Sequence, residues 1–219
     1  MTLESSRTLG GIGAILLLIG LIPFAEPYLG VIALIGFILV LIALHGLGNF
    51  YKEDRIFDNA LYGFIAAIVG VVAAVVAAIY IIFYTSIVTS FLDKIYPGWN
   101  GSWSSLVGLT PTTSGITFQD VAPVLGAVFS VLAILWVFLI ISSFFNRRSL
   151  TMLSTKTSVG LFSTAGLLLL IGAVLVIVFI GIVLMWIAVL LMAIAFFQIK
   201  PKLEETVSST APSPQTLTP

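Results

Sequence analysis

Long apolar runs separated by short polar stretches make up most of this chain. The first run, residues 9–47, is interrupted by Pro23 and Pro27 on either side of Glu26, and proline stops a helix because it lacks an N–H donor. The last run, residues 161–199, holds 39 residues without a charge, twice the ~20 residues that cross a bilayer. We therefore expect each run to form a helical hairpin, the second one turning near residues 179–181.

Two further apolar runs lie between these hairpins. The run at residues 60–90 exceeds a single crossing, so we expect its helix to tilt or to project outward. The run at residues 121–145 has a clear start, because Asp120 can accept hydrogen bonds from exposed N–H groups and Pro123 is tolerated in a first turn. The pattern predicts an all-α polytopic membrane bundle of six transmembrane helices, at about residues 9–24, 28–47, 60–90, 121–145, 160–178 and 181–199.

Composition and charge support this interpretation and orient it. Of the 219 residues, 60% are hydrophobic and 8% are charged, whereas soluble domains have roughly 45–50% apolar and about 25% charged residues. With the amino terminus inside, eight of the nine Lys and Arg residues fall on the inner side and only Lys94 falls outside. The positive-inside rule then predicts a cell-membrane protein with both termini in the cytoplasm.

The two ends of the chain are read separately from the bundle. No small-residue cleavage site follows the first apolar run, so we expect the first helix to be retained instead of removed as a signal peptide. Residues 201–219 are rich in Ser, Thr and Pro, and we expect them to form a disordered cytoplasmic tail.

The two hairpin runs resemble each other. At a constant offset of 152, residues 9–47 and 161–199 share eleven identities in 39 positions, the best block being LLLIG at 16–20 and 168–172. A shared orientation of both hairpins would make them a parallel repeat about an axis along the membrane normal. Two Leu-rich and Ile-rich hairpins that match by composition alone explain the identities equally well.

Three short stretches carry a resemblance to a known family. They are RTLGGIG at residues 7–13, NALYGF at 59–64 and GLFSTAGLLLLI at 160–171. On these stretches the chain resembles the archaeal multi-span membrane proteins grouped as a domain of unknown function, the 996 family. The resemblance covers about residues 5–200 and leaves out the tail. It implies an archaeal membrane context and supplies no catalytic residues, since no activity is established for the family.

Small residues recur on one face of the predicted third helix. The stripe consists of Gly63, Ala66, Ala67, Gly70, Ala74 and Ala78. Small residues at this spacing let another helix approach closely, which is how helices associate in lipid. The expected use is packing within the chain, and a seam between copies in a homo-oligomer is the alternative.

The predicted outer loop, residues 91–120, is long for a connector and contains Tyr96, Trp99 and Trp103. These aromatic residues could lie in the membrane interface as a belt, which we favour, or could form a recognition surface for a partner. Asn100 begins the sequence Asn-Gly-Ser, so it is a candidate for N-glycosylation on the outer face.

Basic residues follow the predicted fourth helix directly. Arg147 and Arg148 come after Phe144 and Phe145, and Lys156 lies a few residues further on. These three cations are candidates for contact with anionic lipid headgroups. Their anchoring of the helix topology explains them equally well.

Two single ionisable residues belong to the first hairpin. His45 is the only histidine and has no neighbouring Cys, Asp or Glu that would complete a metal site. We expect a hydrogen-bonded interfacial side chain, with proton sensing as the alternative. Glu26 is expected to be a solvated turn residue, the alternative being a functional carboxylate in the membrane.

The chemistry of the chain favours a role without catalysis. The chain has no Cys, and nine basic residues balance nine acidic ones; it also lacks the common phosphate-loop, HExxH and GxSxG signatures. We expect no enzymatic activity, cofactor, metal site or nucleic-acid partner. The expected function is a scaffold or accessory subunit of a membrane complex, in contact with lipids and with a protein partner or a second copy. The alternative is a small-solute channel or transporter.

Overall fold

The computed structural model describes residues 2–21 and 29–200, and these residues form helices and no strands. Six helices are long and apolar enough to cross a membrane. They are α1 (Leu3–Gly20), α2 (Leu29–Tyr51), α3 (Arg55–Tyr84), α5 (Phe118–Thr157), α6 (Leu161–Leu175), which continues into the short 3-10 helix η2 (Val176–Val178), and α7 (Ile180–Gln198). The prediction of an all-α protein with six such helices is confirmed. The expected tip of the first hairpin, with Glu26, and the expected tail at 201–219 lie outside the described residues.

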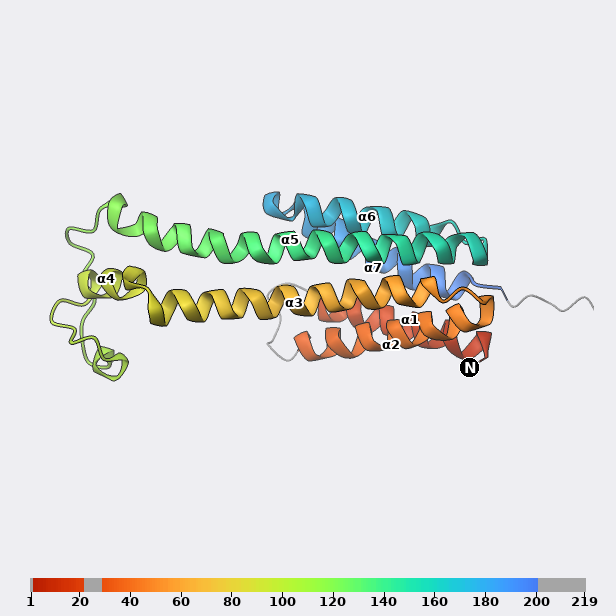
Figure 1. The fold of residues 1–219 in the computed structure, drawn as a ribbon, viewed down its shortest axis with the longest axis horizontal. Coiled ribbons are helices and arrows are strands. Elements are labelled where there is room, and N and C mark those ends of the chain that lie inside the picture. Colours follow the sequence, from red (N-terminus) through yellow and green to blue (C-terminus); the bar gives the residue numbers. More distant parts are fainter. Residues whose placement is uncertain (1, 22–28, 201–219) are drawn as a thin grey trace, which may run out of the picture.

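The six long helices form a closed ring. Along it α1 contacts α2, α2 contacts α3, α3 contacts α5, α5 contacts α6, α6 contacts α7, and α7 returns to α1. We call the end of the bundle where α1 begins and α7 ends the basal end, and the end that carries the short helix α4 (Ser86–Ile95) the distal end (Figure 1). Neighbours along the ring run antiparallel (Figure 1).

A tightly packed core holds the basal end together. The rings of Phe162 on α6 and Phe196 on α7 meet edge to face with centroids 5.1 Å apart, and both side chains are fully buried. Gly10 on α1 lies directly on the Phe196 ring, where any side chain would overlap it. Leu47 and Ile56, at the end of α2 and the start of α3, are also fully buried. With Leu150 and Leu153 of α5, all six long helices therefore share a single core at the basal end.

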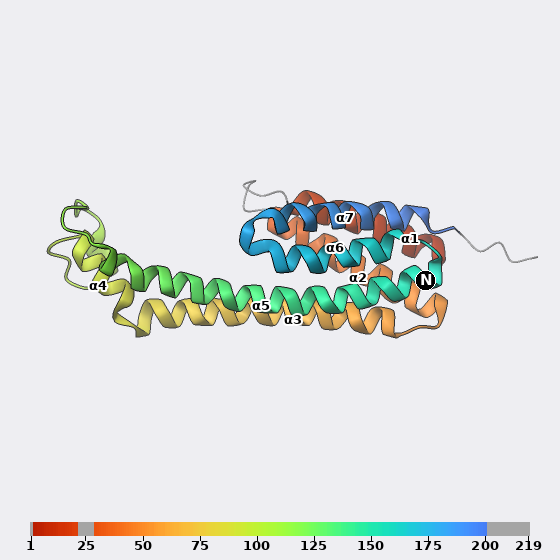
Figure 2. The same cartoon turned by 90° about the horizontal axis from the view of Figure 1, so that it is seen from above.

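Two of the helices are much longer than the others. Helix α3 has 30 residues and α5 has 40, which at 1.5 Å per residue gives about 45 Å and about 60 Å. Both continue beyond the other four helices, side by side, as a two-helix extension (Figures 1 and 2). We call this extension the arm and define it as residues 71–84 of α3 and 118–135 of α5. The expectation that the third apolar run projects outward matches this geometry.

The boundaries of the long helices differ from those expected. The run at 60–90 is divided at Thr85, whose extended backbone (φ −111°, ψ 154°) ends α3 and begins α4. Helix α5 continues past residue 145 for three more turns and ends at Ser158, which has a left-handed φ of 57°. The polar residues after Phe145 stay helical because Ser149, Leu150 and Leu153 of this segment are buried in the basal core.

The turn between α6 and α7 is apolar throughout. It falls at residues 176–181, near the expected division at 179–181. Phe179 has a left-handed φ of 62° and donates its backbone N–H to the Val176 carbonyl oxygen over 3.0 Å. Gly181 packs against the backbone of Gly172 and leaves no room for a side chain. Ile177 is 61% exposed and Phe179 is 77% exposed, so the turn presents large apolar side chains outward.

The two hairpins that resemble each other in sequence also have a close helix–helix contact at equivalent positions. In the first, Gly20 lies against Ala33; in the second, Gly172 lies against Met185. The offset of 152 residues relates both members of these pairs. The close approach of the two helices of each hairpin thus occurs at equivalent positions, which supports the predicted repeat; the repeat itself remains a prediction.

Candidate functional site

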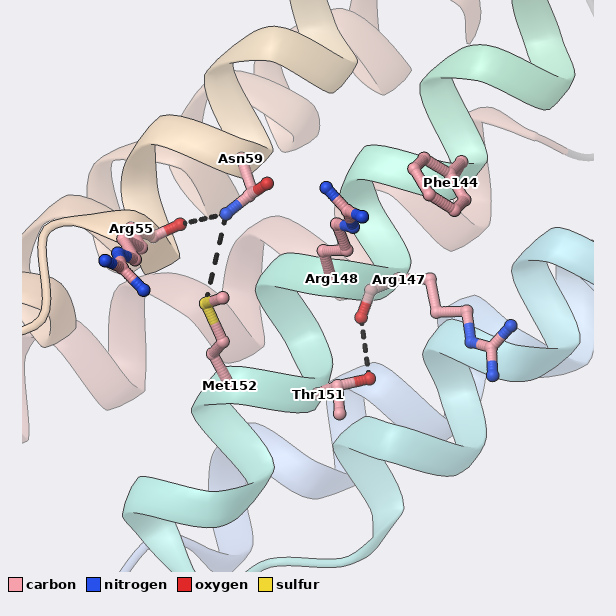
Figure 3. Close-up of a pocket in the computed structure, with 7 residues that line it drawn as sticks. All are labelled: Arg55, Asn59, Phe144, Arg147, Arg148, Thr151 and Met152. Carbon is pink, nitrogen blue, oxygen red and sulfur yellow. Dashed lines mark hydrogen bonds between the residues drawn. The ribbon is translucent and has the colours of Figure 1, made fainter.

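An open recess of about 530 Å³ lies between the basal parts of α3 and α5 (Figure 3). Seven residues line it: Arg55, Asn59, Phe144, Arg147, Arg148, Thr151 and Met152. The first two come from α3 and the other five from α5. The recess therefore depends on how these two long helices are fixed against each other.

Buried polar contacts set that register. The Ser149 hydroxyl, fully buried on α5, donates a hydrogen bond of 2.5 Å to the backbone carbonyl of Ile56 on α3. Two turns along α3 in the distal direction, Gly63 lies against the Asn146 amide and the Ser142 carbonyl. A side chain at Gly63 would push the helices apart. These contacts bring Arg55, at the start of α3, level with the polar segment of α5.

The recess is strongly basic. Arg55, Arg147 and Arg148 contribute three positive charges, and no Asp or Glu is among the lining residues. Among the described residues, salt bridges join Lys156 to Glu53, at 3.1 Å, and Lys94 to Asp120. The three recess arginines belong to neither bridge. Their charge is available to an anion.

Part of this basic surface is held in place by its neighbours. The Arg148 guanidinium lies 4.6 Å from the centre of the Phe144 ring, a cation–π contact one turn along α5. The Asn59 side-chain N–H donates to the Arg55 carbonyl over 2.7 Å and approaches the Met152 sulfur at 3.9 Å. Figure 3 shows Arg55 and Arg148 on opposite helices, with the Arg147 side chain pointing the other way, toward α6.

The structure groups the predicted basic residues differently from the sequence pattern. Arg147 and Arg148 lie together in the recess, but Lys156 does not line it and is paired with Glu53 instead. Arg55 takes the third place. Arg55 precedes the third apolar run, and nothing in the local pattern signals that it shares a recess with Arg148, 93 residues later.

The predicted small-residue stripe of α3 faces α5. Gly63, Gly70 and Ala74 are buried on this face, with Gly70 directly on the Phe138 ring. Ala66, Ala67 and Ala78 are half-buried. Ala78 lines a small apolar groove that α3 shares with Val88 of α4 and Val124 of α5. The stripe thus accounts for the close pairing of α3 and α5 within the chain.

Aromatic residues cluster at the distal end. Trp99 is 8% exposed and donates its indole N–H to the Ser102 carbonyl over 2.7 Å, so it supports the loop from within and offers little surface to a partner. Trp103 is 45% exposed and lies between Trp99, at 6.0 Å, and Phe83 of α3, at 6.3 Å between ring centroids. Tyr96 is half-buried. Of the three predicted loop aromatics, Trp103 is the one that faces outward.

A charged clamp closes the base of this loop. Asp120 accepts hydrogen bonds from the Thr117 backbone N–H, at 2.9 Å, and from its hydroxyl, at 2.8 Å, which caps the start of α5. Lys94, at the end of α4, forms a salt bridge with the same carboxylate. The Lys94 ammonium and the Thr117 donors lower the pKa of Asp120, which lies outside the apolar run of α5, from 3.8 to about 2. The carboxylate is therefore charged at neutral pH.

Two other predicted residues are exposed. The Asn100 side-chain oxygen Oδ1 accepts hydrogen bonds from the Ser102 N–H, at 3.0 Å, and the Ser105 hydroxyl, at 2.6 Å, which places the glycosylation candidate in a surface turn. His45 hydrogen-bonds to Asn49 at 3.2 Å and meets the Phe57 ring edge to face at 4.7 Å. His45 is therefore hydrogen-bonded, as expected, and its interfacial position stays a prediction.

Comparison with known proteins yields one family and one relative. Residues 32–190 match the family described as proteins of unknown function, DUF996. An uncharacterised protein of Methanocaldococcus jannaschii is 30% identical over 204 residues, which cover 93% of this chain and 97% of the relative. No solved structure matches. The family match includes the arm, the recess and the NALYGF and GLFSTAGLLLLI stretches, and the chain therefore belongs to the DUF996 family.

Proposed function

We propose that this protein is a non-enzymatic scaffold or accessory subunit of a membrane complex, inserted in the cell membrane with both termini in the cytoplasm. The charge distribution supports the orientation. At the basal end lie the described cations Arg7, Lys52, Arg55, Arg147, Arg148, Lys156 and Lys200, whereas Lys94 lies at the distal end beside Asp120. Under the positive-inside rule the basal end faces the cytoplasm.

The length of α3 supports a position for the membrane. From Asn59 to Tyr80, α3 rises by about 32 Å, close to the ~30 Å of a hydrocarbon core. Tyr80 and Tyr84 stack at the distal end with ring centroids 5.7 Å apart, and exposed Trp103 lies nearby on Phe83. Tyr and Trp prefer the membrane–water interface. This placement puts the arginine recess at one interface and the aromatic cluster at the other.

The observation that carries the proposal is that none of the other four long helices lies beside the arm within the described residues, where only the short helix α4 contacts its distal part. Val72 and Val76 on α3 and Phe129 on α5 are 55%, 60% and 66% exposed. The other four helices stop short of this level (Figure 1), so the arm leaves room beside it for helices of another subunit. Just basal to the arm, its two helices are held in close contact at Gly70 and Phe138, which gives the arm a firm base for such packing.

The distribution of buried polar groups favours packing over solute conduction. The buried polar side chains among the described residues are four serines, Ser6, Ser142, Ser143 and Ser149. None of them lies in the arm, and Ser149 is used to join α5 to α3. Transporters usually place polar or charged groups near the bilayer midplane.

Copurification from the native membrane tests the proposal. The tagged chain would be extracted in mild detergent and its complexes weighed by native mass spectrometry. We expect a foreign subunit in fixed stoichiometry with the wild type. Val76→Phe should reduce its recovery because the larger side chain alters the arm surface. Val183→Phe is the matched control, since Val183 on α7 is 58% exposed and Val76 is 60% exposed.

A chain recovered alone as a monomer would contradict the proposal, as would a foreign subunit that Val76→Phe and Val183→Phe release equally. A pure homo-oligomer that also gives solute flux in proteoliposomes above that of empty vesicles would favour the channel or transporter alternative.

A further inference from the structure

We propose that the recess lined by Arg55 and Arg148 binds the phosphate group of an anionic ligand at the cytoplasmic membrane interface. An anionic phospholipid headgroup and a soluble phosphate compound share this chemistry. The inference concerns a ligand site and does not depend on the scaffold role.

The positive charges of the recess are the first argument for this site. Arg55 and Arg148 stand on opposite helices of one recess, Arg147 flanks it, and no lining residue is acidic. A guanidinium presents several N–H donors in a planar fork that matches the oxygens of a phosphate. Like charges gathered in this way repel one another, and an oxyanion between them relieves the repulsion.

The acidic residues of the neighbouring segment do not neutralise the site. Glu53 is occupied by Lys156 at 3.1 Å. Asp54 and Asp58 are exposed and do not line the recess. The positive charges of Arg55 and Arg148 in the recess are therefore not neutralised by these carboxylates, and Arg147 adds a further positive charge at its edge.

The size and the lining of the recess are the second argument for this site. Its volume of about 530 Å³ falls within the roughly 300–1,000 Å³ of small-ligand sites. Phe144 and Met152 add apolar surface beside the guanidinium groups, and Phe144 also fixes Arg148 from one side. The apolar run of α5 ends at Phe145, directly next to the arginines. A ligand with a charged phosphate and an adjoining apolar part matches this juxtaposition.

Native mass spectrometry with added lipid tests the site. Purified full-length protein in detergent would be titrated with phosphatidylglycerol, which is anionic, and with phosphatidylcholine, which is zwitterionic. We expect one retained phosphatidylglycerol molecule per chain and weaker retention of phosphatidylcholine. The double variant Arg55→Gln/Arg148→Gln should weaken phosphatidylglycerol binding about tenfold or more, because charge-assisted hydrogen bonds to the phosphate are lost.

A charge-matched control variant distinguishes binding in the recess from general electrostatic attraction to the basal end. Lys52→Gln/Lys200→Gln also removes two positive charges from the basal end, and both lysines are exposed and outside the recess. We expect this control to keep wild-type affinity. Equal affinity in the wild type and the recess variant, equal losses in the recess variant and the control, or equal retention of both lipids would overturn the proposal.

A competition experiment identifies the source of the phosphate. Inorganic phosphate at millimolar concentration should leave phosphatidylglycerol bound if the site takes a lipid headgroup, and should displace it if the site takes soluble phosphates. Should the double variant fail to purify as a monodisperse protein, Arg148→Lys replaces it. This change keeps the charge but loses the planar fork and its stacking on Phe144, so affinity should still fall. Unchanged affinity in a well-folded Arg148→Lys protein would then count against the site.

Discussion

The indole N–H of Trp136 on α5 donates a hydrogen bond to the Ala173 carbonyl oxygen on α6 over 3.0 Å. The Val174 carbonyl lies within 3.3 Å of the same nitrogen. Both carbonyls belong to the last turn of α6, where backbone oxygens have no partner further along the helix. The bond thus fixes the level along α5 at which the second hairpin turns.

Replacing Trp136 with Phe should therefore destabilise the bundle. The ring is kept in part while the donor is lost, and we expect the free energy of unfolding to fall by about 0.5–1.5 kcal/mol. Thermal unfolding in detergent would measure the change. Trp186→Phe on α7 is the control, because the Trp186 indole makes no hydrogen bond within the described part of the chain. A Trp136→Phe protein as stable as this control would contradict the assigned role of the bond.

Glycine positions on the two arm helices should respond in opposite directions. Gly70→Ala places a methyl group against the Phe138 ring, and overpacking of this kind costs about 1–3 kcal/mol. Gly126→Ala on α5 meets nothing within 4 Å, and alanine in a helix interior is favoured over glycine by up to about 1 kcal/mol. Unfolding of both variants in the same detergent would show whether the signs differ. Destabilisation by Gly126→Ala equal to that by Gly70→Ala would refute the packing assigned to the α3 stripe.

The α6–α7 turn should be inaccessible from water on either side. Its outward side chains are Ile177, Val178, Phe179 and Ile180, and its level at Trp136 lies well inside the apolar run of α5. The chain has no native Cys, so Phe179→Cys gives a single thiol. We expect a membrane-impermeant maleimide to label it only after detergent is added. Thr113→Cys, at an exposed position of the distal loop, is the accessible control. Equal labelling of the two in intact membranes would place the turn in water.

The salt bridge between Lys94 and Asp120 at the distal end should break in acid. The folded-state pKa of Asp120, at about 2, lies below its ordinary value of 3.8, so its stabilising effect is fully present above pH 4. That effect is lost as the pH falls toward 2, where the carboxylate takes up a proton. Tryptophan fluorescence of Trp99 and Trp103 between pH 6 and pH 2 would follow the change. Asp120→Asn should abolish this transition, and its persistence in that variant would assign it to another group.

The helical architecture could be predicted from the sequence because hydrocarbon admits few alternatives. Uncharged runs of sufficient length must form helices that satisfy their own backbone, and the apolar hairpin at 161–199 is an example. The limits of the long helices were less predictable. No proline or glycine marks Thr85, and the helical state of the segment after Phe145 depends on burial of Leu150 and Leu153 in a core formed by other helices.

The candidate site was predicted only in part, for the same reason. Arg147 and Arg148 are adjacent in sequence and could be proposed together. Arg55 joins them through the register of α3 on α5, which rests on the Ser149 to Ile56 hydrogen bond and on contacts around Gly63. Trp99 shows the converse case, since its burial inside the distal loop depends on a turn conformation that no periodic pattern encodes.

The unequal lengths of the helices have a consequence for the surrounding lipid. On the arm side, the molecule presents an apolar height that matches a full bilayer, whereas beside α6 and α7 this height ends at the turn around Phe179. A bilayer of uniform thickness cannot match both sides, so lipids next to the short hairpin must thin or tilt at a modest energetic cost for each ångström. The apolar height of the protein therefore differs between its two sides. Membranes with a lateral gradient of thickness should collect it at the boundary and orient it there.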